Sequence, residues 1–378
     1  MIPDPNQPAS GLPTAFVPHP DLSPPVATTG VIGWLRINLF ATPLNALMTL
    51  LVLALLVRYV PPMLDWLLFS AHWRGSGREA CDGGGGACWV FIRQRLGQFI
   101  YGFYPESQRW RVNLVWVIAI AASWPLLLRR NRLQMPSGLF MLFAFPVIAY
   151  GLYTGPLFGL PDVETSQWGG LMLTLTIAVV GIAGSLPGGI VLALGRRSKM
   201  PIIRTLCVTI IEFWRGVPLI TVLFMSSVML PLFLPEGLSF DKLLRALIGV
   251  VLFESAYIAE VVRGGLQAIP KGQYEAADAL GLNYPKAMGL IILPQALKLV
   301  IPGIVNTMIA LFKDTSLVII IGLYDLLNSI QQAAVDPNWL GFATEGYVFA
   351  ALMYWAFCFS MSRYSQHLER RLHTGHRR

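Results

Sequence analysis

The stretch Pro270-Lys-Gly-Gln-Tyr-Glu-Ala-Ala-Asp-Ala-Leu-Gly281, continued by Leu-Asn-Tyr-Pro-Lys-Ala-Met-Gly-Leu-Ile-Ile-Leu-Pro294, separates two long apolar segments. Its first part predicts a short helix that ends at Gly281, because glycine readily adopts the left-handed conformation that closes a helix. Asn283 can cap a second helix, Pro285 suits its first turn, and Pro294 is expected to interrupt it. The sequence therefore predicts a polar helix–turn–helix unit within the connection 264–300, between two apolar helices.

The first of these two helices has the features of a docking surface. Glu275 lies near its positive N-terminal end. Ala276 and Ala277 keep the helix thin, so a partner's groove could close on its backbone, while Tyr274 and Leu280 offer apolar anchors. On physical grounds alone, an amphipathic hairpin whose alanines merely favour a helix is an equally good interpretation.

The rest of the chain lacks the polar surface of a soluble protein. Of its 378 residues, 55% are hydrophobic and only 13% are charged, whereas about 25% of residues are charged in soluble domains. Apolar stretches of about 17 to 25 residues, long enough to cross a bilayer as helices, recur along the chain. We predict an all-α membrane protein with eight spans, at about 42–60, 113–128, 139–157, 170–194, 217–234, 243–262, 301–323 and 347–361.

The basic residues give the orientation of these spans, because Lys and Arg are retained on the cytoplasmic side during insertion. They follow the second, fourth, sixth and eighth spans, whereas acidic residues without Lys or Arg follow the third and seventh. The connection after the fifth span is mixed, since Lys242 and Arg245 accompany Glu236 and Asp241, and we still place it outside. Both termini are therefore predicted to be cytoplasmic. The basic residues in question include Arg129, Arg130, Arg132, Arg196, Arg197, Lys199, Arg204, Arg263, Lys271, Lys286 and Lys298.

Two segments of the N-terminal part are not apolar. Residues 1–37 begin with a proline-rich stretch that predicts a disordered tail. The connection 61–112 is predicted to lie outside, in an oxidising compartment, and contains Cys81 and Cys88 on either side of a glycine-rich spacer. These two cysteines can form a short-loop disulfide, and the alternative is two free thiols beside a flexible linker.

The spacing within the opening stretch resembles a known signature. Glu-Ala-Ala, three residues, Gly, nine residues and Ile-x-Leu-Pro form the loop by which permeases of bacterial ATP-binding-cassette importers are identified. Two further stretches, Glu212-Phe-Trp-Arg-Gly-Val-Pro-Leu219 and Lys313-Asp-Thr-Ser-Leu-Val318, resemble the polar amino acid branch of that family. The branch usually has Thr where this chain has Val217, and the general L-amino acid subtype carries a similar N-terminal extension. The loop residues that the resemblance implies are Tyr274, Glu275, Ala276, Ala277, Gly281, Leu282, Ile291, Leu293 and Pro294.

The resemblance implies a type I importer core of five helices at residues 165–365, preceded by a three-span extension at 38–160 and followed by a basic cytoplasmic tail at 366–378. It further implies a bacterial inner-membrane location and three kinds of partner: a cytoplasmic ATPase dimer, a second permease subunit, either identical or related, and a periplasmic amino-acid-binding protein. ATP and Mg would be bound by the ATPase. The resemblance implies that this chain is a transport subunit and no enzyme, and that it moves a broad range of L-amino acids, as the general L-amino acid subtype does.

Ionisable residues inside the predicted spans are the candidates for the transport pathway, since each costs about 2.5 to 3.5 kcal/mol at mid-bilayer on insertion scales. Glu254 falls near the middle of the sixth span, and Lys313 and Asp314 fall near the middle of the seventh. We predict a contact between Glu254 and Lys313, which would serve either as a structural ion pair or as part of the pathway together with Thr315 and Ser316. A secondary transporter that uses Glu254, Lys313 and Asp314 as an ion or proton relay is the alternative function.

Several other classes of function lack a motif in this sequence. The five histidines form no cluster with Cys or carboxylates at metal-binding spacing, so we predict no metal site. Phosphate loops, Rossmann fingerprints and nucleophile elbows are also missing from the sequence. The net charge of +8 arises from basic residues at membrane edges, so we expect no nucleic-acid partner. An energy source must therefore come from another subunit.

Overall fold

The computed structural model describes residues 30–372 except 129–131, 234 and 236–239, and the described chain is almost entirely helical. Most of the predicted tail, together with Arg129, Arg130 and Glu236, lies outside the described residues. The chain divides into two compact units, Met1–Ala71 and His72–Arg378. Each unit is described separately below.

The first unit contains α1 (Gly30–Asn38), α2 (Pro43–Leu64) and the π-turn η2 (Asp65–Phe69). Thr42 caps α2 by accepting a hydrogen bond from the Asn45 backbone N–H at 3.2 Å. No residue of α2 is buried, and its leucines and valines are exposed on all sides. A helix that is apolar all round without protein neighbours is one that lipid can solvate.

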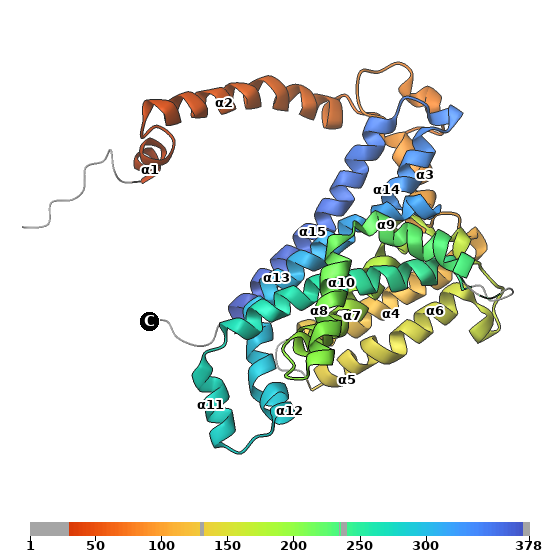
Figure 1. Cartoon of the computed structure of the whole chain (residues 1–378). Helices are drawn as coiled ribbons and strands as arrows, with labels where there is room; N and C mark the ends of the chain where they lie inside the picture. Colours follow the sequence, from red (N-terminus) through yellow and green to blue (C-terminus); the bar gives the residue numbers. More distant parts are fainter. Residues whose placement is uncertain (1–29, 129–131, 234, 236–239, 373–378) are drawn as a thin grey trace, which may run out of the picture. The chain divides into compact units, whose positions relative to one another are not determined.

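The second unit is a bundle built around α7 (Gly170–Arg196) and α10 (Lys242–Ala268) (Figure 1). Its remaining long helices are α4 (Arg109–Leu127), α8 (Pro201–Gly216), α13 (Leu293–Asp314) and α15 (Ala343–Leu372). Shorter elements include α3 (Trp89–Tyr101), α5 (Gln134–Leu139), η5 (Phe140–Ala144), α6 (Phe145–Thr154), α9 (Leu219–Phe224), η8 (Met225–Met229), η9 (Leu230–Phe233), η11 (Thr315–Ile321), β1 (Tyr324–Asp325) and α14 (Leu326–Ala334).

A stripe of glycines brings α7 and α10 into close contact. A Cβ atom at Gly184 would lie 2.8 Å from Val251, and one at Gly188 would lie 2.4 Å from Ser255. Gly189 is equally crowded, with Ile258 2.4 Å from its hypothetical Cβ. Small residues at helical spacing allow membrane helices to pack backbone against backbone. The structure thus assigns these glycines to packing.

Residues 72–160, which precede the predicted core, belong to the same compact unit as the core. Val90, Phe91 and Phe99 of α3 are buried in one cluster with Ile330 of α14 and Trp339. The structure also joins Cys81 and Cys88 by a disulfide, just before α3. Apolar side chains of α3, α4 and α6 are buried against later helices of the same unit, which begins at His72. The division into an extension at 38–160 and a core at 165–365 stays a prediction.

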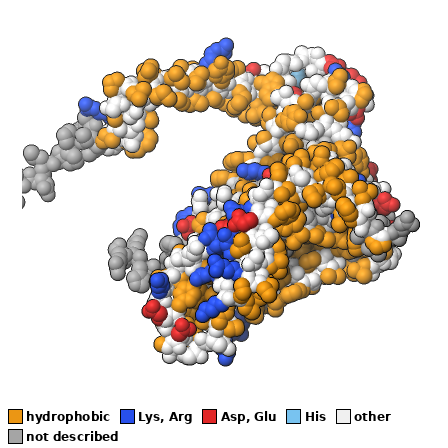
Figure 2. Space-filling view, viewed as in Figure 1, with side chains coloured by type: hydrophobic (Ala, Val, Ile, Leu, Met, Phe, Trp, Pro, Cys, Tyr) orange, Lys and Arg blue, Asp and Glu red, His pale blue; other side chains and the backbone are white. Residues whose placement is uncertain are grey.

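Among the described residues, four helical segments are long and apolar enough to cross a membrane, or five if a bent pair counts as one span, so the eight predicted spans are not confirmed. These segments are Pro43–Phe69, Gln134–Thr154, Gly170–Arg196 and Tyr284–Ile321, and the bent pair joins Pro201–Gly216 to Leu219–Phe233 at 103°. Helices also occupy the other predicted spans, but α10 carries several charged residues, among them Arg245, Glu254 and Glu260. Figure 2 shows hydrophobic side chains over most of the visible face of the bundle.

Candidate functional site

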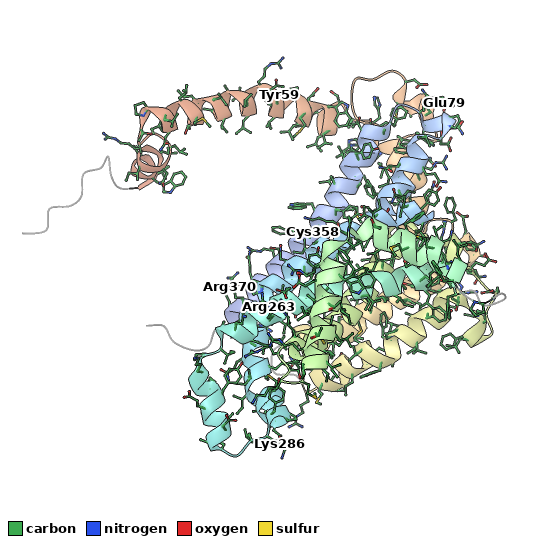
Figure 3. The ribbon with its side chains drawn as sticks, viewed as in Figure 1. Tyr59, Glu79, Arg263, Lys286, Cys358 and Arg370 are labelled. Carbon is green, nitrogen blue, oxygen red and sulfur yellow. A yellow bond between two sulfur atoms is a disulfide. The ribbon has the colours of Figure 1, made fainter. Side chains whose placement is uncertain are left out.

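The predicted helix–turn–helix unit is present as a hairpin that extends from one end of the bundle, whereas α3 and α14 lie at the opposite end (Figure 1). It consists of α11 (Lys271–Ala279) and α12 (Tyr284–Ala287). Figure 3 shows Lys286 at the end of this hairpin. We refer to residues 264–294 as the hairpin segment.

The turn between the two helices has the left-handed glycine and the closing hydrogen bonds that end a helix. Gly281 has φ of +68°, its N–H donates to the carbonyl of Asp278 at 2.9 Å, and the N–H of Leu282 donates to the carbonyl of Ala277 at 3.1 Å. This pair of bonds is a Schellman motif. Asn283 caps α12 by accepting a hydrogen bond from the Lys286 N–H at 3.3 Å. The predictions for Gly281 and Asn283 are confirmed.

The two faces of α11 differ in what they contact. Glu275, Ala276 and Leu280 are exposed, and Leu280 keeps 73% of its surface accessible. Ala277 is fully buried against the bundle. A bare apolar side chain beside a carboxylate on a thin helix is a surface that a partner protein can cover.

Tyr274 is half-buried and its hydroxyl bonds to the bundle, and its role as an apolar anchor for a partner stays a prediction. Its hydroxyl donates to the carbonyl of Leu266 at 3.2 Å and accepts a hydrogen bond from Arg197 at 3.0 Å. The Arg197 guanidinium also lies over the tyrosine ring, 5.6 Å from its centroid. Tyr274 therefore fixes α11 to the ends of α7 and α10.

Pro294 also differs from expectation, because it does not end the second helix. A π-turn, η10 (Met288–Ile292), connects α12 to α13, so that Tyr284–Ile321 forms one apolar helical segment. Pro294 lies in the first turn of α13, where a proline needs no hydrogen bond to its nitrogen. Ile291 and Leu293 pack against the buried cluster formed by Met288, Ile292 and residues of α10.

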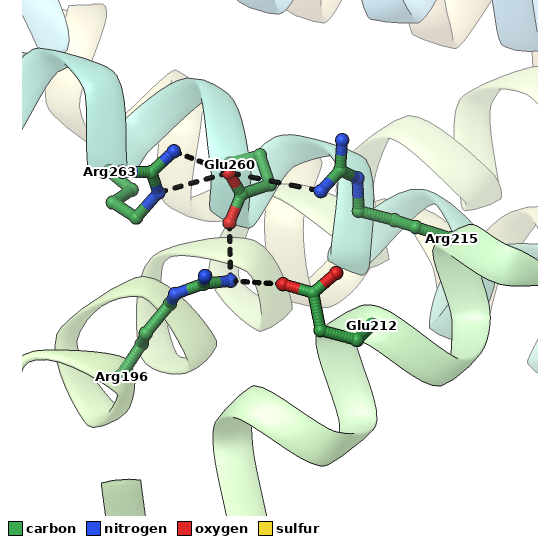
Figure 4. A network of polar contacts seen from close by, with 5 residues as sticks. All are labelled: Arg196, Glu212, Arg215, Glu260 and Arg263. Carbon is green, nitrogen blue, oxygen red and sulfur yellow. Dashed lines mark hydrogen bonds and ion pairs between the residues drawn. The ribbon is translucent and has the colours of Figure 1, made fainter. Parts of the chain in front are cut away.

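Beside the hairpin segment, one carboxylate joins the ends of three helices (Figure 4). Glu260 of α10 accepts from Arg196 of α7 at 2.7 Å and from Arg263 at 2.7 Å and 3.0 Å, and Arg215 of α8 lies 3.8 Å away. Glu260 and Arg263 thus pair at i, i+3 spacing along α10. Glu212 and Arg215 have the same spacing, but Glu212 contacts Arg196 at 2.9 Å.

The predicted contact between Glu254 and Lys313 is absent from the ion pairs of the described chain. Glu254 is buried at 3% exposure, whereas Lys313 is exposed and lies within electrostatic reach of Cys358 on α15. The two side chains therefore do not form the predicted pair, since one is buried among the helices and the other is exposed.

Thr315 and Ser316 use their hydroxyl groups locally. Thr315 donates to the carbonyl of Phe312 at 2.9 Å, and Ser316 donates to that of Lys313 at 3.0 Å. Such bonds satisfy hydroxyls within membrane helices without a ligand. A pathway role for Glu254, Lys313, Asp314, Thr315 and Ser316 stays a prediction.

Sequence reasoning missed a buried polar network at the other end of the bundle. Asp325 is fully buried and accepts hydrogen bonds from the Asn328 N–H at 3.0 Å and from the hydroxyl of Tyr354 at 2.7 Å. Burial raises the pKa of the Asp325 carboxyl above its ordinary value. The backbone of Leu326 donates to Thr174 at 3.0 Å, which ties this network to α7. The capping pattern of Asp325 before an apolar helix is the signal that could have identified it.

The network at Asp325 holds no metal-ligand cluster, and in the described ranges no group of three or more His, Cys, Asp or Glu could hold a metal ion. The geometry thus consists of an apolar bundle, a protruding hairpin segment with one exposed face, and charged contacts that link this hairpin to three helix ends. Such an arrangement can transmit movement between subunits.

Comparison with known proteins defines the class of this protein. Residues 185–374 match the family model described as the inner membrane component of binding-protein-dependent transport systems. The chain belongs to this family and is a multi-pass inner-membrane permease. The resemblance to importer permeases that the hairpin sequence indicated is confirmed.

Two relatives match almost the whole length of this chain. The chain is 61% identical to the inner membrane amino-acid ABC transporter permease protein YhdY of Escherichia coli, over 94% of this chain and 97% of that protein. It is 42% identical to BztC of Rhodobacter capsulatus, a glutamate/glutamine/aspartate/asparagine transport system permease protein, over 96% of this chain and 99% of the relative. The probable glutamine permease protein GlnP of Bacillus subtilis is 34% identical but covers only 53% of this chain, with 91% of its own length matched.

Proposed function

We propose that this protein is the membrane permease subunit of an importer that moves amino acids, driven by ATP hydrolysis in a separate subunit. The observation that carries the proposal is the hairpin segment: its exposed face with Glu275, Ala276 and Leu280 is held by a Schellman turn and fixed to the bundle through Tyr274. A rigid, thin helix of this kind can transfer a displacement from a docked ATPase subunit to the membrane helices.

The proposed topology has eight crossings with both termini in the cytoplasm. Besides the apolar segments, α4, α10 and α15 contain 19, 27 and 30 residues, and about 20 residues suffice to cross the hydrocarbon core. The charged residues of these helices would lie at the membrane surface or pair with other residues of the chain. Glu260 of α10, for example, pairs with Arg196 and Arg263. The hairpin segment then faces the cytoplasm, and the disulfide between Cys81 and Cys88 faces the oxidising outer compartment. Residues 38–160 form the extension and 165–365 the importer core, between a tail at 1–37 and a basic tail at 366–378.

The proposed partners follow from the family and from the names of relatives. A cytoplasmic ATPase dimer would bind ATP and Mg and would receive the hairpin segment, a second permease chain would complete the pathway, and a periplasmic binding protein would deliver cargo. The cargo would be a broad range of L-amino acids, since the relative BztC is named for four different ones. The permease itself would be no enzyme.

Reconstitution tests this proposal directly. The chain is co-expressed with the ATPase, permease and binding protein of its own importer, and the complex is placed in vesicles. We expect amino acid uptake only when the binding protein is present and ATP is supplied on the side of the membrane where the ATPase lies. Uptake driven by a proton gradient alone, without ATP, would instead support the secondary-transporter alternative.

A further inference from the structure

The ion-pair group formed by Arg196, Glu212, Arg215, Glu260 and Arg263 has no role in the proposed docking of the ATPase, yet it lies directly beside the hairpin segment. We call it the Glu260 cluster (Figure 4). Its members come from the end of α7, from α8 and from α10. Three helices that are separate in sequence are therefore held together through one side chain.

Glu260 is the carboxylate on which this cluster depends. It is 16% exposed and its two oxygens contact all three arginines, at 2.7 Å for Arg196, 2.7 Å for Arg263 and 3.8 Å for Arg215. Glu212, the other acid of the cluster, is 54% exposed and contacts Arg196. Exposed pairs contribute little because solvent screens them, whereas a half-buried carboxylate with several guanidinium partners holds its geometry.

The last residue of α7, Arg196, and the residue after it, Arg197, connect the Glu260 cluster to the hairpin segment. Arg196 binds Glu260, and its neighbour Arg197 donates at 3.0 Å both to the carbonyl of Leu266 and to the hydroxyl of Tyr274 on α11. On the other side of the cluster, α8 ends at Gly216, where the chain bends by 103° into the segment that begins with α9. A continuous set of contacts therefore runs from α11 to the broken helix.

We propose that Glu260 is a positioning residue for transport: it makes the ends of α7, α8 and α10 move together with α11, so that displacement of the hairpin segment reorients the bent helix pair. This inference rests on the proposed function. Without the Glu260 carboxylate, α11 still docks through its exposed face, but three arginines repel one another and α8 loses its ion pair to α10, keeping only the exposed pair of Glu212 with Arg196. ATP hydrolysis then continues with little transport.

The test compares uptake with ATP hydrolysis in vesicles that contain the complete importer with its binding protein. For Glu260→Gln we expect the number of amino acids imported per ATP to fall roughly tenfold, while ATP hydrolysis and co-purification of the ATPase change less than about twofold. Glu260→Asp should recover part of the loss. Glu79→Gln, the same change at the opposite end of the bundle (Figure 3), is the control and should retain the wild-type ratio.

A combined variant keeps the inference falsifiable if Glu260→Gln assembles poorly. Arg196→Glu with Glu260→Arg restores opposite charges across α7 and α10, and we expect it to regain more coupling than either single change. A role confined to stability would lower uptake and hydrolysis equally, and that outcome, or an unchanged ratio in Glu260→Gln, overturns the inference. If the wild-type complex shows no ATP-dependent uptake, the proposed function fails instead.

Discussion

The close contact between α7 and α10 is the feature of the fold that a single methyl group should perturb most clearly. We consider Gly189→Ala. The added Cβ would lie 2.4 Å from Ile258 Cγ2, 2.6 Å from Ile258 Cβ and 3.0 Å from the Ala259 nitrogen. Favourable carbon–carbon contacts lie at about 3.5–4.0 Å, so α10 must retreat by roughly 1 Å. The Ile258 Cβ and the Ala259 nitrogen are fixed to the helix backbone, so no rotamer change relieves the clash.

The magnitude follows from two opposing effects. Overpacking of a close contact costs about 1–3 kcal/mol, and replacement of a helical glycine by alanine returns about 0.8–1.0 kcal/mol. We therefore expect Gly189→Ala to lower the free energy of unfolding by up to about 2 kcal/mol. Gly264→Ala is the matched control on α10, because nothing lies within 4 Å of its hypothetical Cβ, and it should be neutral or stabilising.

The assay is unfolding of the purified protein in mixed micelles by an increasing mole fraction of sodium dodecyl sulfate, followed by tryptophan fluorescence. Gly189→Ala should unfold at a lower mole fraction than the wild type, and Gly264→Ala at the same or a higher one. Equal stability of Gly189→Ala and Gly264→Ala would refute the reasoning that the glycine stripe sets the distance between the helices.

Three further predictions concern other parts of the structure. Serine at both Cys81 and Cys88, seven residues apart, should lower the free energy of unfolding by about 2.4 kcal/mol through loss of the cross-link, measured by the same unfolding assay, whereas Cys358→Ser should change it less. Gly281→Ala should cost about 1 kcal/mol because φ is positive, and hydrogen exchange should report faster opening of α11. Because the folded pKa of Asp325 is raised above its ordinary value of 3.8, the free energy of unfolding should fall as pH rises through the folded pKa. Asp325→Asn should remove that part of the pH dependence, as denaturation at several pH values will show.

Local sequence patterns predicted the hairpin segment well, because its contacts span few residues. A glycine at the end of α11 and an asparagine before α12 each act on backbone groups within five positions, so the Schellman turn and the cap follow from the sequence. Apolar runs likewise predicted α2 and α7 with errors of a few residues at their ends. Such signals need no knowledge of tertiary packing.

Contacts between distant segments were predicted less well, since spacing along one helix does not show which face meets a neighbour. Glu212 has the spacing for a pair with Arg215 but binds Arg196 instead. Lys313 has the depth for a pair with Glu254 but points elsewhere. The helices α3, α8 and α14 were not predicted at all, because their apolar residues are spread among polar ones and become buried only against other parts of the bundle.

The proposals on the amino acid cargo and the partner subunits depend on the family and the relatives. The proposed docking role of the hairpin segment, in contrast, can be tested by a single substitution in this chain, measured in the complete importer. Glu275→Lys reverses the charge on the exposed face of α11 and leaves the buried contacts of Ala277 and Tyr274 in place. Glu79→Lys makes the same change at the opposite end of the bundle and is the control (Figure 3).

The decisive measurement is the affinity of the ATPase for the membrane-inserted permease, taken together with ATP-driven uptake by the complete importer. For Glu275→Lys we predict normal membrane insertion, an affinity at least roughly tenfold lower, and a corresponding loss of uptake, while Glu79→Lys binds the ATPase as the wild type does. Wild-type ATPase affinity and uptake in Glu275→Lys would contradict the central claim that the ATPase binds to this hairpin segment.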